Sequence, residues 1–156
     1  MRIGSLFSGI GGIDRGLEQS GLGRTVWQVE QNPFCRTVLT KHWPGVNRSV
    51  TDVRQANAAN LAAVDLIAAG FPCQDIADSE GAGLAGTRSG LWFEALRVIR
   101  ELRPRCAIIE NVAGLSTKGL DTVLSGLASC GYDAVWFPLR AFELGAPHGR
   151  ARIWIV

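Results

Sequence analysis

The feature that most constrains the fold is the stretch from Asp65 to Gln74, which reads DLIAAGFPCQ. Its first half is a short apolar run, typical of a strand that is buried on both faces of a parallel sheet. Gly70 and Pro72 end that strand abruptly, and the first side chain after the proline is the thiol of Cys73. Loops at the carboxyl ends of such strands line the ligand crevice of an open α/β sheet, so this layout predicts Cys73 at the mouth of a site.

Two interpretations of Cys73 are open at this point. A thiol can act as a nucleophile when its surroundings lower its pKa or when an acid assists the attack. Cysteine is also a small residue that often fills a hydrophobic core without any chemical role. The stretch by itself favours the second interpretation, and only the rest of the chain reverses that preference.

Length and composition predict one soluble globular domain. The 156 residues are enough to bury a core, and Arg2 leads directly into a strand-like run, so we expect no signal peptide. All basic residues except Lys41 and Lys118 are arginines, which suit contacts with phosphates and bases, although the net charge is only +2. The cysteines at positions 35, 73, 106 and 130 have no zinc-ligand spacing, so we expect a reduced, cytoplasmic protein without a metal site.

A glycine-rich turn follows the first predicted strand, residues 3–7. The turn reads Ser8-Gly9-Ile10-Gly11-Gly12, and an apolar face of a short helix comes after it. Such a turn lets a ligand approach the backbone and offers it the amides of a helix N-terminus. The dinucleotide fingerprint needs glycine where this chain has Asp14, so the turn predicts a nucleotide-like ligand but disfavours a dinucleotide-dependent oxidoreductase. A purely structural turn is the alternative.

Two acidic residues fall where predicted strands end. The second strand, residues 25–30, ends at Glu30, at the spacing where an acid in doubly wound folds binds ribose hydroxyls. A helix is expected to begin at Pro33. Residues 50–53 predict a weak third strand, from which Asp52 would face the same crevice. Each acid could instead cap a helix or lie in solvent, but their register with the glycine turn favours a ligand site.

The second half of the chain begins with a polar, glycine-rich segment over residues 75–90, which is typical of a functional loop. Apolar residues at helical spacing then predict helices over 91–103, ended by Pro104, and over 119–130.

The remaining strands of the predicted sheet carry further polar groups. A buried strand over residues 106–109 ends in Glu110-Asn111-Val112, which puts a carboxyl group beside the expected Cys73 strand. Arg150 and Arg152 alternate at the start of the last strand, so both should lie on one face. On their own, two such arginines would be interpreted as solvent-exposed side chains at a sheet edge. That last strand is predicted to form an antiparallel pair, residues 133–139 with residues 151–156.

Taken together, these motifs resemble the catalytic half of the DNA (cytosine-5)-methyltransferase family. The matching residues are, in chain order, Phe7-Ser8-Gly9-Ile10-Gly11-Gly12, Glu30, Asp52, Gly70-Phe71-Pro72-Cys73-Gln74, Arg88-Ser89-Gly90-Leu91, Glu110-Asn111-Val112, Arg150 and Arg152. The resemblance covers essentially the whole chain. It implies a doubly wound, mostly parallel α/β sheet of the S-adenosylmethionine-dependent methyltransferase (Rossmann-like) type, with residues 1–156 forming one catalytic and cofactor-binding domain.

The resemblance implies the activity of a DNA cytosine-5 methyltransferase of the kind found in restriction-modification, acting on a base flipped out of double-stranded DNA. Cys73 would add to C6 of the cytosine so that C5 can attack a methyl group. Glu110 would hold N3 and the exocyclic amine, Arg152 would hold O2, and Arg150 would assist nearby. The loop over residues 75–90 would close over the base.

The resemblance also implies S-adenosylmethionine as the methyl donor. Glu30 would bind its ribose and Asp52 its adenine amine. The residues that would form the cofactor site are Phe7, Ser8, Gly9, Ile10, Gly11, Gly12, Glu30, Asp52, Gly70 and Leu91.

The family's target-recognition region and C-terminal motifs follow the arginine pair, and we expect them to be absent because the chain stops at Val156. Two alternatives to an independent enzyme follow from this expectation. One is a truncated, non-catalytic relic, and the other is a subunit of a split methyltransferase whose second chain supplies target recognition. Ala151, between the two arginines, stands where the family commonly has an acid.

Overall fold

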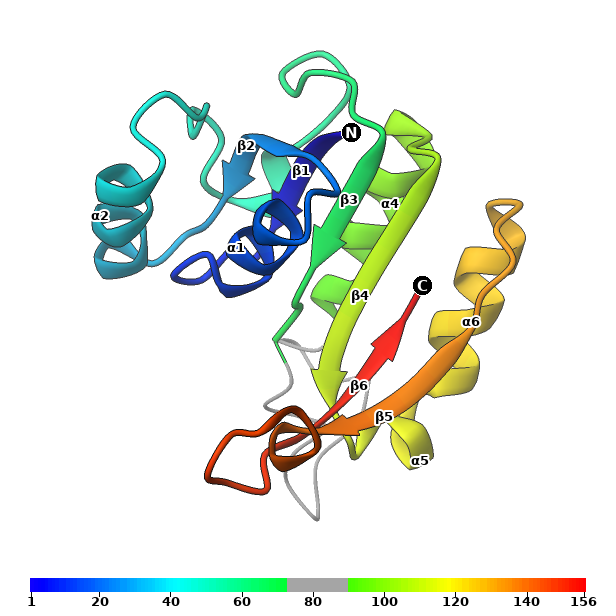
Figure 1. Ribbon diagram of the computed structural model, residues 1–156. Helices are drawn as coiled ribbons and strands as arrows, with labels where there is room; N and C mark the ends of the chain where they lie inside the picture. Colours follow the sequence, from blue (N-terminus) through cyan, green and yellow to red (C-terminus); the bar gives the residue numbers. More distant parts are fainter. Residues whose placement is uncertain (73–89) are drawn as a thin grey trace. The chain divides into compact units, whose positions relative to one another are not determined.

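The computed structural model describes residues 1–72 and 90–156 (Figure 1). It divides into two compact units. The first unit comprises Met1–Gly70 and Arg97–Ala107, and the second comprises the described residues of Phe71–Leu96 together with Ile108–Val156.

Helices and strands alternate through most of the chain, and six strands form one mixed sheet in the order β2-β1-β3-β4-β6-β5. The elements are β1 (Arg2–Leu6), α1 (Gly12–Gln19), β2 (Arg24–Val29), α2 (Pro33–His42), η1 (Val53–Gln55), β3 (Leu66–Ala69), α4 (Leu91–Leu102), β4 (Cys106–Val112), α5 (Leu115–Lys118), α6 (Leu120–Ser129), β5 (Trp136–Arg140), η3 (Ala141–Leu144) and β6 (Ala151–Ile155). Apart from the strand expected over residues 50–53, the strands and long helices predicted from the periodicity are therefore present, with ends shifted by a few residues.

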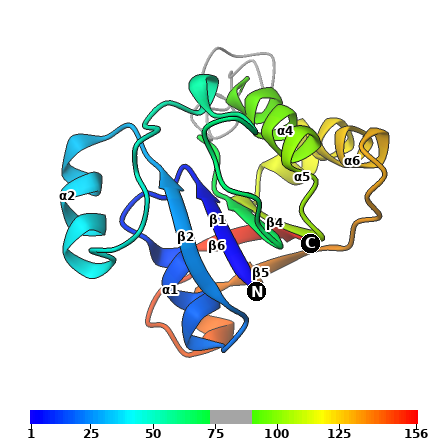
Figure 2. The same cartoon turned by 90° about the horizontal axis from the view of Figure 1, so that it is seen from above.

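The first unit is built on three parallel strands, with β1 between β2 and β3. Except for the half-buried Val26, their apolar residues are almost completely buried, as expected for a sheet covered on both faces. Figure 2 shows α1 on one side of these strands and the C-terminal half of α4 on the other. Helix α2 begins at Pro33 as predicted, because the Asn32 side chain accepts hydrogen bonds from the amides of Phe34 (2.9 Å) and Cys35 (3.3 Å).

The prediction of a strand over residues 50–53 is wrong. Asp52 instead caps the short 3₁₀ helix η1, because its Oδ1 accepts a hydrogen bond from the backbone amide of Arg54 (3.0 Å). A short polar side chain that bonds to its own backbone in this way competes with strand pairing. Outside the named strands, the described residues give β2 only an isolated parallel bridge, between Trp27 and Asn47.

The second unit is built on antiparallel strands, with β6 paired to β4 on one side and to β5 on the other. Its helix α6 packs against the first half of α4, since a Cβ atom on Gly126 would lie 2.8 Å from the Leu96 side chain. On β4 and β6, one face is buried and carries Ile109, Ile153 and Ile155.

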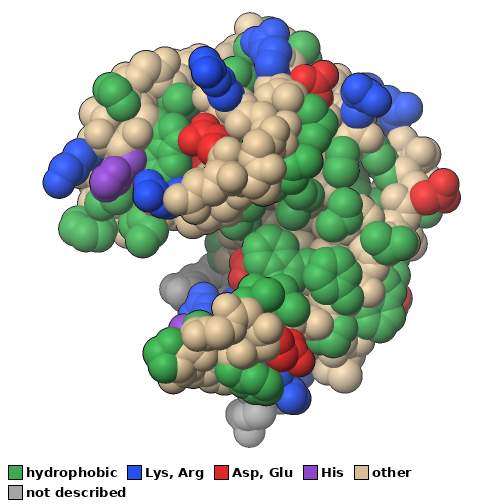
Figure 3. Space-filling model, in the orientation of Figure 1, with side chains coloured by type: hydrophobic (Ala, Val, Ile, Leu, Met, Phe, Trp, Pro, Cys, Tyr) green, Lys and Arg blue, Asp and Glu red, His purple; other side chains and the backbone are tan. Residues whose placement is uncertain are grey.

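The opposite face of these strands is only partly covered. It carries Glu110, Trp154 and Phe137, which lie opposite one another in neighbouring strands. Figure 3 shows hydrophobic side chains gathered on this face, over β5 and β6. Several exposed apolar residues of the second unit belong to β5 or to the segments beside it: Val135, Trp136, Phe137, Phe142 and Leu144.

Two glycines of the first unit give a paired test of the packing. A Cβ atom on Gly4 would overlap the buried indole ring of Trp27, whereas one on Gly16, inside α1, would meet no atom within 4 Å. We expect Gly4→Ala to lower the free energy of unfolding by about 1–3 kcal/mol, because the ring cannot move without displacing the core. Gly16→Ala should raise it by about 0.5–1 kcal/mol, since alanine is the better helix former. Urea unfolding of both variants measures the difference, and equal stabilities would contradict the packing described for Trp27.

Candidate functional site

The glycine-rich turn leaves the end of β1 in an unusual backbone conformation. Phe7 (φ 54°), Gly9 (φ 55°) and Gly11 (φ 85°) all adopt left-handed values, which are costly for a residue with a side chain such as Phe7. Ser8 anchors the turn inward, with its amide donating to the carbonyl of Val29 (3.3 Å) and its hydroxyl to the carbonyl of Ser5 (3.1 Å). The turn is thereby fixed to the ends of both β1 and β2.

The glycines of the turn serve two different purposes. A Cβ atom on Gly9 or Gly12 would meet nothing within 4 Å, so the backbone there is open to a ligand. A Cβ atom on Gly11 would overlap the ring of Trp43, so glycine is required at that position for packing. Ile10, between them, is exposed.

Glu30 lies against this turn, as the spacing predicted. Its Oε2 accepts a hydrogen bond from the amide of Gly9 (2.8 Å), and its Oε1 accepts one from the amide of Asn32 (2.7 Å). A carboxylate has about four acceptor positions, so two amides leave room for the hydroxyls of a ligand. The turn and the acid therefore form one polar group at the ends of β1 and β2.

The other predicted cofactor residues are placed less directly. The Asp52 carboxylate forms an ion pair with Arg54 (2.6 Å), and the hydrogen bonds of that guanidinium hold the pKa of Asp52 below its ordinary value. An amine bound to Asp52 would therefore share the carboxylate with Arg54. Gly70 directly follows β3, while Leu91 is the first residue of α4 and belongs to the second unit.

In the second unit, the structure brings together Glu110 of β4 and Arg152 of β6. The Arg152 Nε lies 2.7 Å from Glu110 Oε1, and each side chain keeps about a fifth of its surface exposed (20% and 22%). The two residues share one face of the antiparallel pair, in cross-strand pairs that are two positions apart in the register. Arg150 precedes β6 and is exposed, with its backbone amide donating to His148 Nδ1 (3.4 Å).

The backbone that leads into Cys73 is held by Asn111 of β4. The buried Asn111 side chain donates from Nδ2 to the carbonyl of Phe71 (3.2 Å), and its Oδ1 accepts from the amide of Val112 (2.8 Å). The Phe71 ring also contacts the ring of Trp92, with 5.5 Å between their centroids. Cys73 and residues 75–89 of the predicted loop lie outside the described residues. That range includes Arg88 and Ser89.

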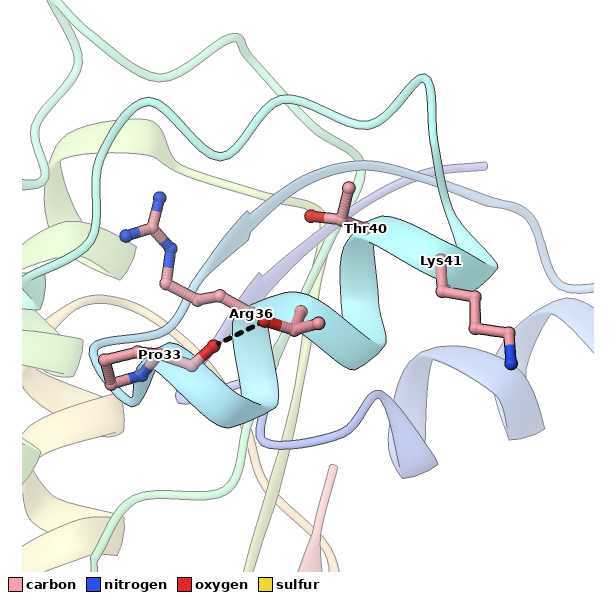
Figure 4. Close-up of a pocket in the computed structure, with 5 residues that line it drawn as sticks. Pro33, Arg36, Thr40 and Lys41 are labelled. Carbon is pink, nitrogen blue, oxygen red and sulfur yellow. Dashed lines mark hydrogen bonds between the residues drawn. The ribbon is translucent and has the colours of Figure 1, made fainter.

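A surface pocket on α2 lies apart from the predicted site residues. It is lined by Pro33, Arg36, Thr37, Thr40 and Lys41, and Figure 4 shows the Thr37 hydroxyl donating to the carbonyl of Pro33 (3.1 Å). None of the predicted site residues lines this pocket, so we assign it no role in the site.

A family model described as C-5 cytosine-specific DNA methylase matches residues 1–156 of the chain. The chain belongs to this family.

Named relatives agree with the assignment of the methylase family. The Type II methyltransferase M2.BsuMI of Bacillus subtilis is 36% identical over 98% of the chain and 41% of its own length. The Type II methyltransferase M.Bsp6I of a Bacillus species is 31% identical over 100% of the chain and 51% of its own length. The methylase chain thus spans about half the length of these relatives or less.

Solved structures confirm the predicted methyltransferase fold. A DNA modification methyltransferase encoded within an E. coli prophage superposes with a TM-score of 0.82, at 25% identity, over 99% of this chain and 45% of its own. The Dnmt2 methyltransferase of S. pombe superposes with a TM-score of 0.79, at 21% identity, over 99% of this chain and 48% of its own.

Two other kinds of feature are absent from the part of the chain that the structure describes. Among residues 1–72 and 90–156, no three His, Cys, Asp or Glu side chains gather where they could hold a metal ion. No helix in the same ranges is long and apolar enough to cross a membrane.

Sequence reasoning assigned no separate role to Asn111. The available signal was its position in the Glu110-Asn111-Val112 motif, but a strand pattern does not reveal that one side chain will reach Phe71, 40 residues earlier in the chain. In the sequence, Asp14 stands out only as a departure from the dinucleotide fingerprint, and the structure shows that it is fully buried beneath the turn.

Asn111 offers a test of how the chain holds the segment before Cys73. Asn111→Leu would leave the Phe71 carbonyl and the Val112 amide without that partner, so we expect the free energy of unfolding to fall by about 2–4 kcal/mol. Asn60 makes the same kinds of bond to backbone groups but is exposed, so Asn60→Leu should change it by only about 0.5–1 kcal/mol. Guanidinium unfolding measures both losses in free energy. Equal losses would show that burial of Asn111 does not increase the contribution of its hydrogen bonds to stability.

Proposed function

We propose that this chain carries the catalytic part of a DNA cytosine-5 methyltransferase that uses S-adenosylmethionine. The single observation that carries the proposal is the Glu110–Arg152 pair, found in a chain of the methylase family. A cytosine offers a donor at its exocyclic amine and acceptors at N3 and O2. A carboxylate beside a guanidinium on one sheet face supplies matching partners for that edge.

The first unit supplies groups that fit the nucleotide part of the cofactor. The open backbone at Gly9 lets a ligand approach, and the Glu30 carboxylate beside it can accept hydrogen bonds from ribose hydroxyls. Phe7 to Gly12, Asp52 and Gly70 of the same unit and Leu91 of the second unit complete the proposed cofactor-binding set. When bound, S-adenosylmethionine supplies an electrophilic methyl group.

The second unit supplies the groups for the base. Glu110 accepts from the exocyclic amine and shares a proton with N3, Arg152 donates to O2, and Arg150 assists from the residue before β6. Glu110 and Arg152 form an ion pair, and a bound cytosine would replace that direct contact. The Glu110 carboxylate and the Arg152 guanidinium would then each exchange one partner for another, and neither charge would lose its hydrogen bonds.

Cys73 is the proposed nucleophile. Its thiolate would add to C6 of cytosine while Glu110 shares its proton with N3, and the electrons would move to C5. C5 would then take the methyl group from the sulfonium of S-adenosylmethionine as the S–CH3 bond breaks and the sulfur leaves as a neutral thioether. Removal of the C5 proton by a base then re-forms the C5–C6 double bond and expels the thiolate. Burial raises the pKa of the Cys35 and Cys106 thiols, which disfavours the thiolate form that a nucleophile needs.

The proposed substrate is double-stranded DNA with the target cytosine flipped out of the helix, at a cost of a few kcal/mol. The proposed biological setting is restriction-modification inside the cell, which the printed names of the Type II relatives support.

A second chain that carries target recognition remains the alternative to an enzyme that acts alone. The exposed apolar residues on and beside β5 support it, because large apolar surfaces on a soluble protein commonly mark a contact with another polypeptide segment. Methylation of DNA by this chain, with and without the product of the neighbouring reading frame, separates the two. Lack of activity in both reactions would favour a non-catalytic relic.

The cofactor assignment predicts that Glu30→Ala weakens S-adenosylmethionine binding about tenfold or more, because charge-assisted hydrogen bonds to the ribose are lost. Titration calorimetry on the wild type and the variant measures this. Asp133→Ala removes an exposed carboxylate of the second unit and should bind like the wild type. Equal binding by Glu30→Ala would remove Glu30 from the ribose role, and preference for a nicotinamide cofactor would overturn the class.

The nucleophile assignment predicts a covalent adduct between Cys73 and DNA that contains 5-fluorocytosine, since fluorine at C5 cannot leave as a proton does. Denaturing gel electrophoresis should show the adduct for the wild type, for Cys35→Ser and for Cys106→Ser, but not for Cys73→Ser. Glu110→Gln should slow its formation about 100-fold or more while leaving cofactor binding intact. The neighbouring gene product is included where the chain alone is inactive, and an adduct in Cys73→Ser would refute the assignment.

A further inference from the structure

A fully buried carboxylate lies beneath the glycine turn, and the proposed chemistry does not use it. Asp14 is in the first turn of α1 and has no exposed surface. Its Oδ2 accepts a hydrogen bond from Ser5 Oγ (2.9 Å), and its Oδ1 accepts one from Gln28 Nε2 (3.0 Å). Ser5 and Gln28 are direct partners in the pairing of β1 with β2. One side chain therefore joins the helix to both strands.

Ordinary helix stabilisation does not account for this burial. A carboxylate in the first turn of a helix interacts favourably with the helix dipole, but an exposed one does so without losing its hydration. Burial raises the pKa of Asp14, which means that the folded protein disfavours the charged form. An apolar residue at this position would avoid that cost. The two hydrogen bonds therefore have to serve something other than helix stability.

The hydrogen bonds continue from Asp14 to the other side of the turn. Gln28 Oε1 accepts from Arg48 Nη1 (2.7 Å), and Arg48 Nη2 donates to the carbonyl of Trp43 (2.8 Å). The Trp43 indole then donates to Glu18 Oε2 (2.9 Å), one helical turn after Asp14. The network returns in this way to α1, where it began.

The network meets the proposed cofactor groups at two places. Ser5 and Gln28 are the last but one residues of β1 and β2, which continue into the glycine turn and Glu30. At the far end, the Trp43 ring occupies the space beside Gly11. The hydrogen bond from the Gly9 amide to Glu30 (2.8 Å) joins the glycine turn to the residue that follows β2.

We propose that Asp14 is a positioning residue for the cofactor site, because its hydrogen bonds to Ser5 and Gln28 set the distance between the glycine turn and Glu30. The proposal rests on the proposed function for its effect on cofactor affinity. Its geometric part concerns the ligand-free chain alone. A purely stabilising role for Asp14 would instead lower the stability of the whole unit and leave the Gly9–Glu30 contact as it is.

The geometric part is tested by amide hydrogen exchange in the full chain without ligand, measured by NMR. Asp14→Ala should lower the protection of the Gly9 amide about tenfold or more relative to the amides of β3. Leu61→Ala, a buried leucine of the same unit, should lower both equally, and Asp14→Asn should stay within about threefold because an amide can still bond to both partners. Unchanged relative protection at Gly9 in Asp14→Ala would overturn the proposal. Where Asp14→Ala does not fold, Ser5→Ala carries the same measurement.

Calorimetry with S-adenosylmethionine tests the functional part on the same variants. Asp14→Ala should bind about tenfold or more weakly, while Asp14→Asn stays within about threefold and Leu61→Ala matches the wild type. Equal binding by the wild type and Asp14→Ala would overturn the positioning role and leave the proposed function intact. If the wild type itself fails to bind, the cofactor assignment fails, and hydrogen exchange at Gly9 still decides the role of Asp14.

Discussion

The register between β1 and β2 is the constraint on which the first unit depends. β2 carries one extra residue where Ile3 pairs with Thr25 but Gly4 pairs with Trp27. A regular ladder would move Glu30 by one residue, about 3.3 Å along the strand, and turn its side chain to the other face of the sheet. The Gly9 amide would then lose its partner. The irregularity near the start of β1 thus determines whether the acid at the far end of β2 meets the turn.

Local sequence patterns predicted the elements well where periodicity was strong and failed where one side chain decided the outcome. The apolar runs of β1 and β3 and the proline at the start of α2 identified these elements without ambiguity. The segment before η1 has the composition of a strand, but the hydrogen bond from the Arg54 amide to Asp52 is invisible in such a pattern. A single polar contact between neighbours was enough to change the class of the element.

The same distinction separates the predicted and unpredicted parts of the site. Glu30 could be placed near the glycine turn because both positions follow from the ends of adjacent parallel strands. Asp14 could not be given a role, since its partners Ser5 and Gln28 lie 9 and 14 residues away and nothing in the sequence marks them as partners. Pairing between Glu110 and Arg152 likewise depends on the antiparallel register of β4 and β6. Positions that follow from the ends of predicted strands can be inferred from the sequence. Side-chain contacts between elements become known only once the fold and its register are known.

The edge of the second unit combines exposed aromatic side chains with a proline. Trp136 and Phe137 are exposed on β5, which is the last strand in the sheet order, and Pro138 follows them opposite Ile153. A proline within a paired strand turns its nitrogen away from the partner strand and leaves the outer edge one donor short. Pairing of a further strand with this edge is therefore hindered, even though the exposed side chains there are apolar. Contacts made at this edge would therefore rest on side chains and not on new backbone hydrogen bonds.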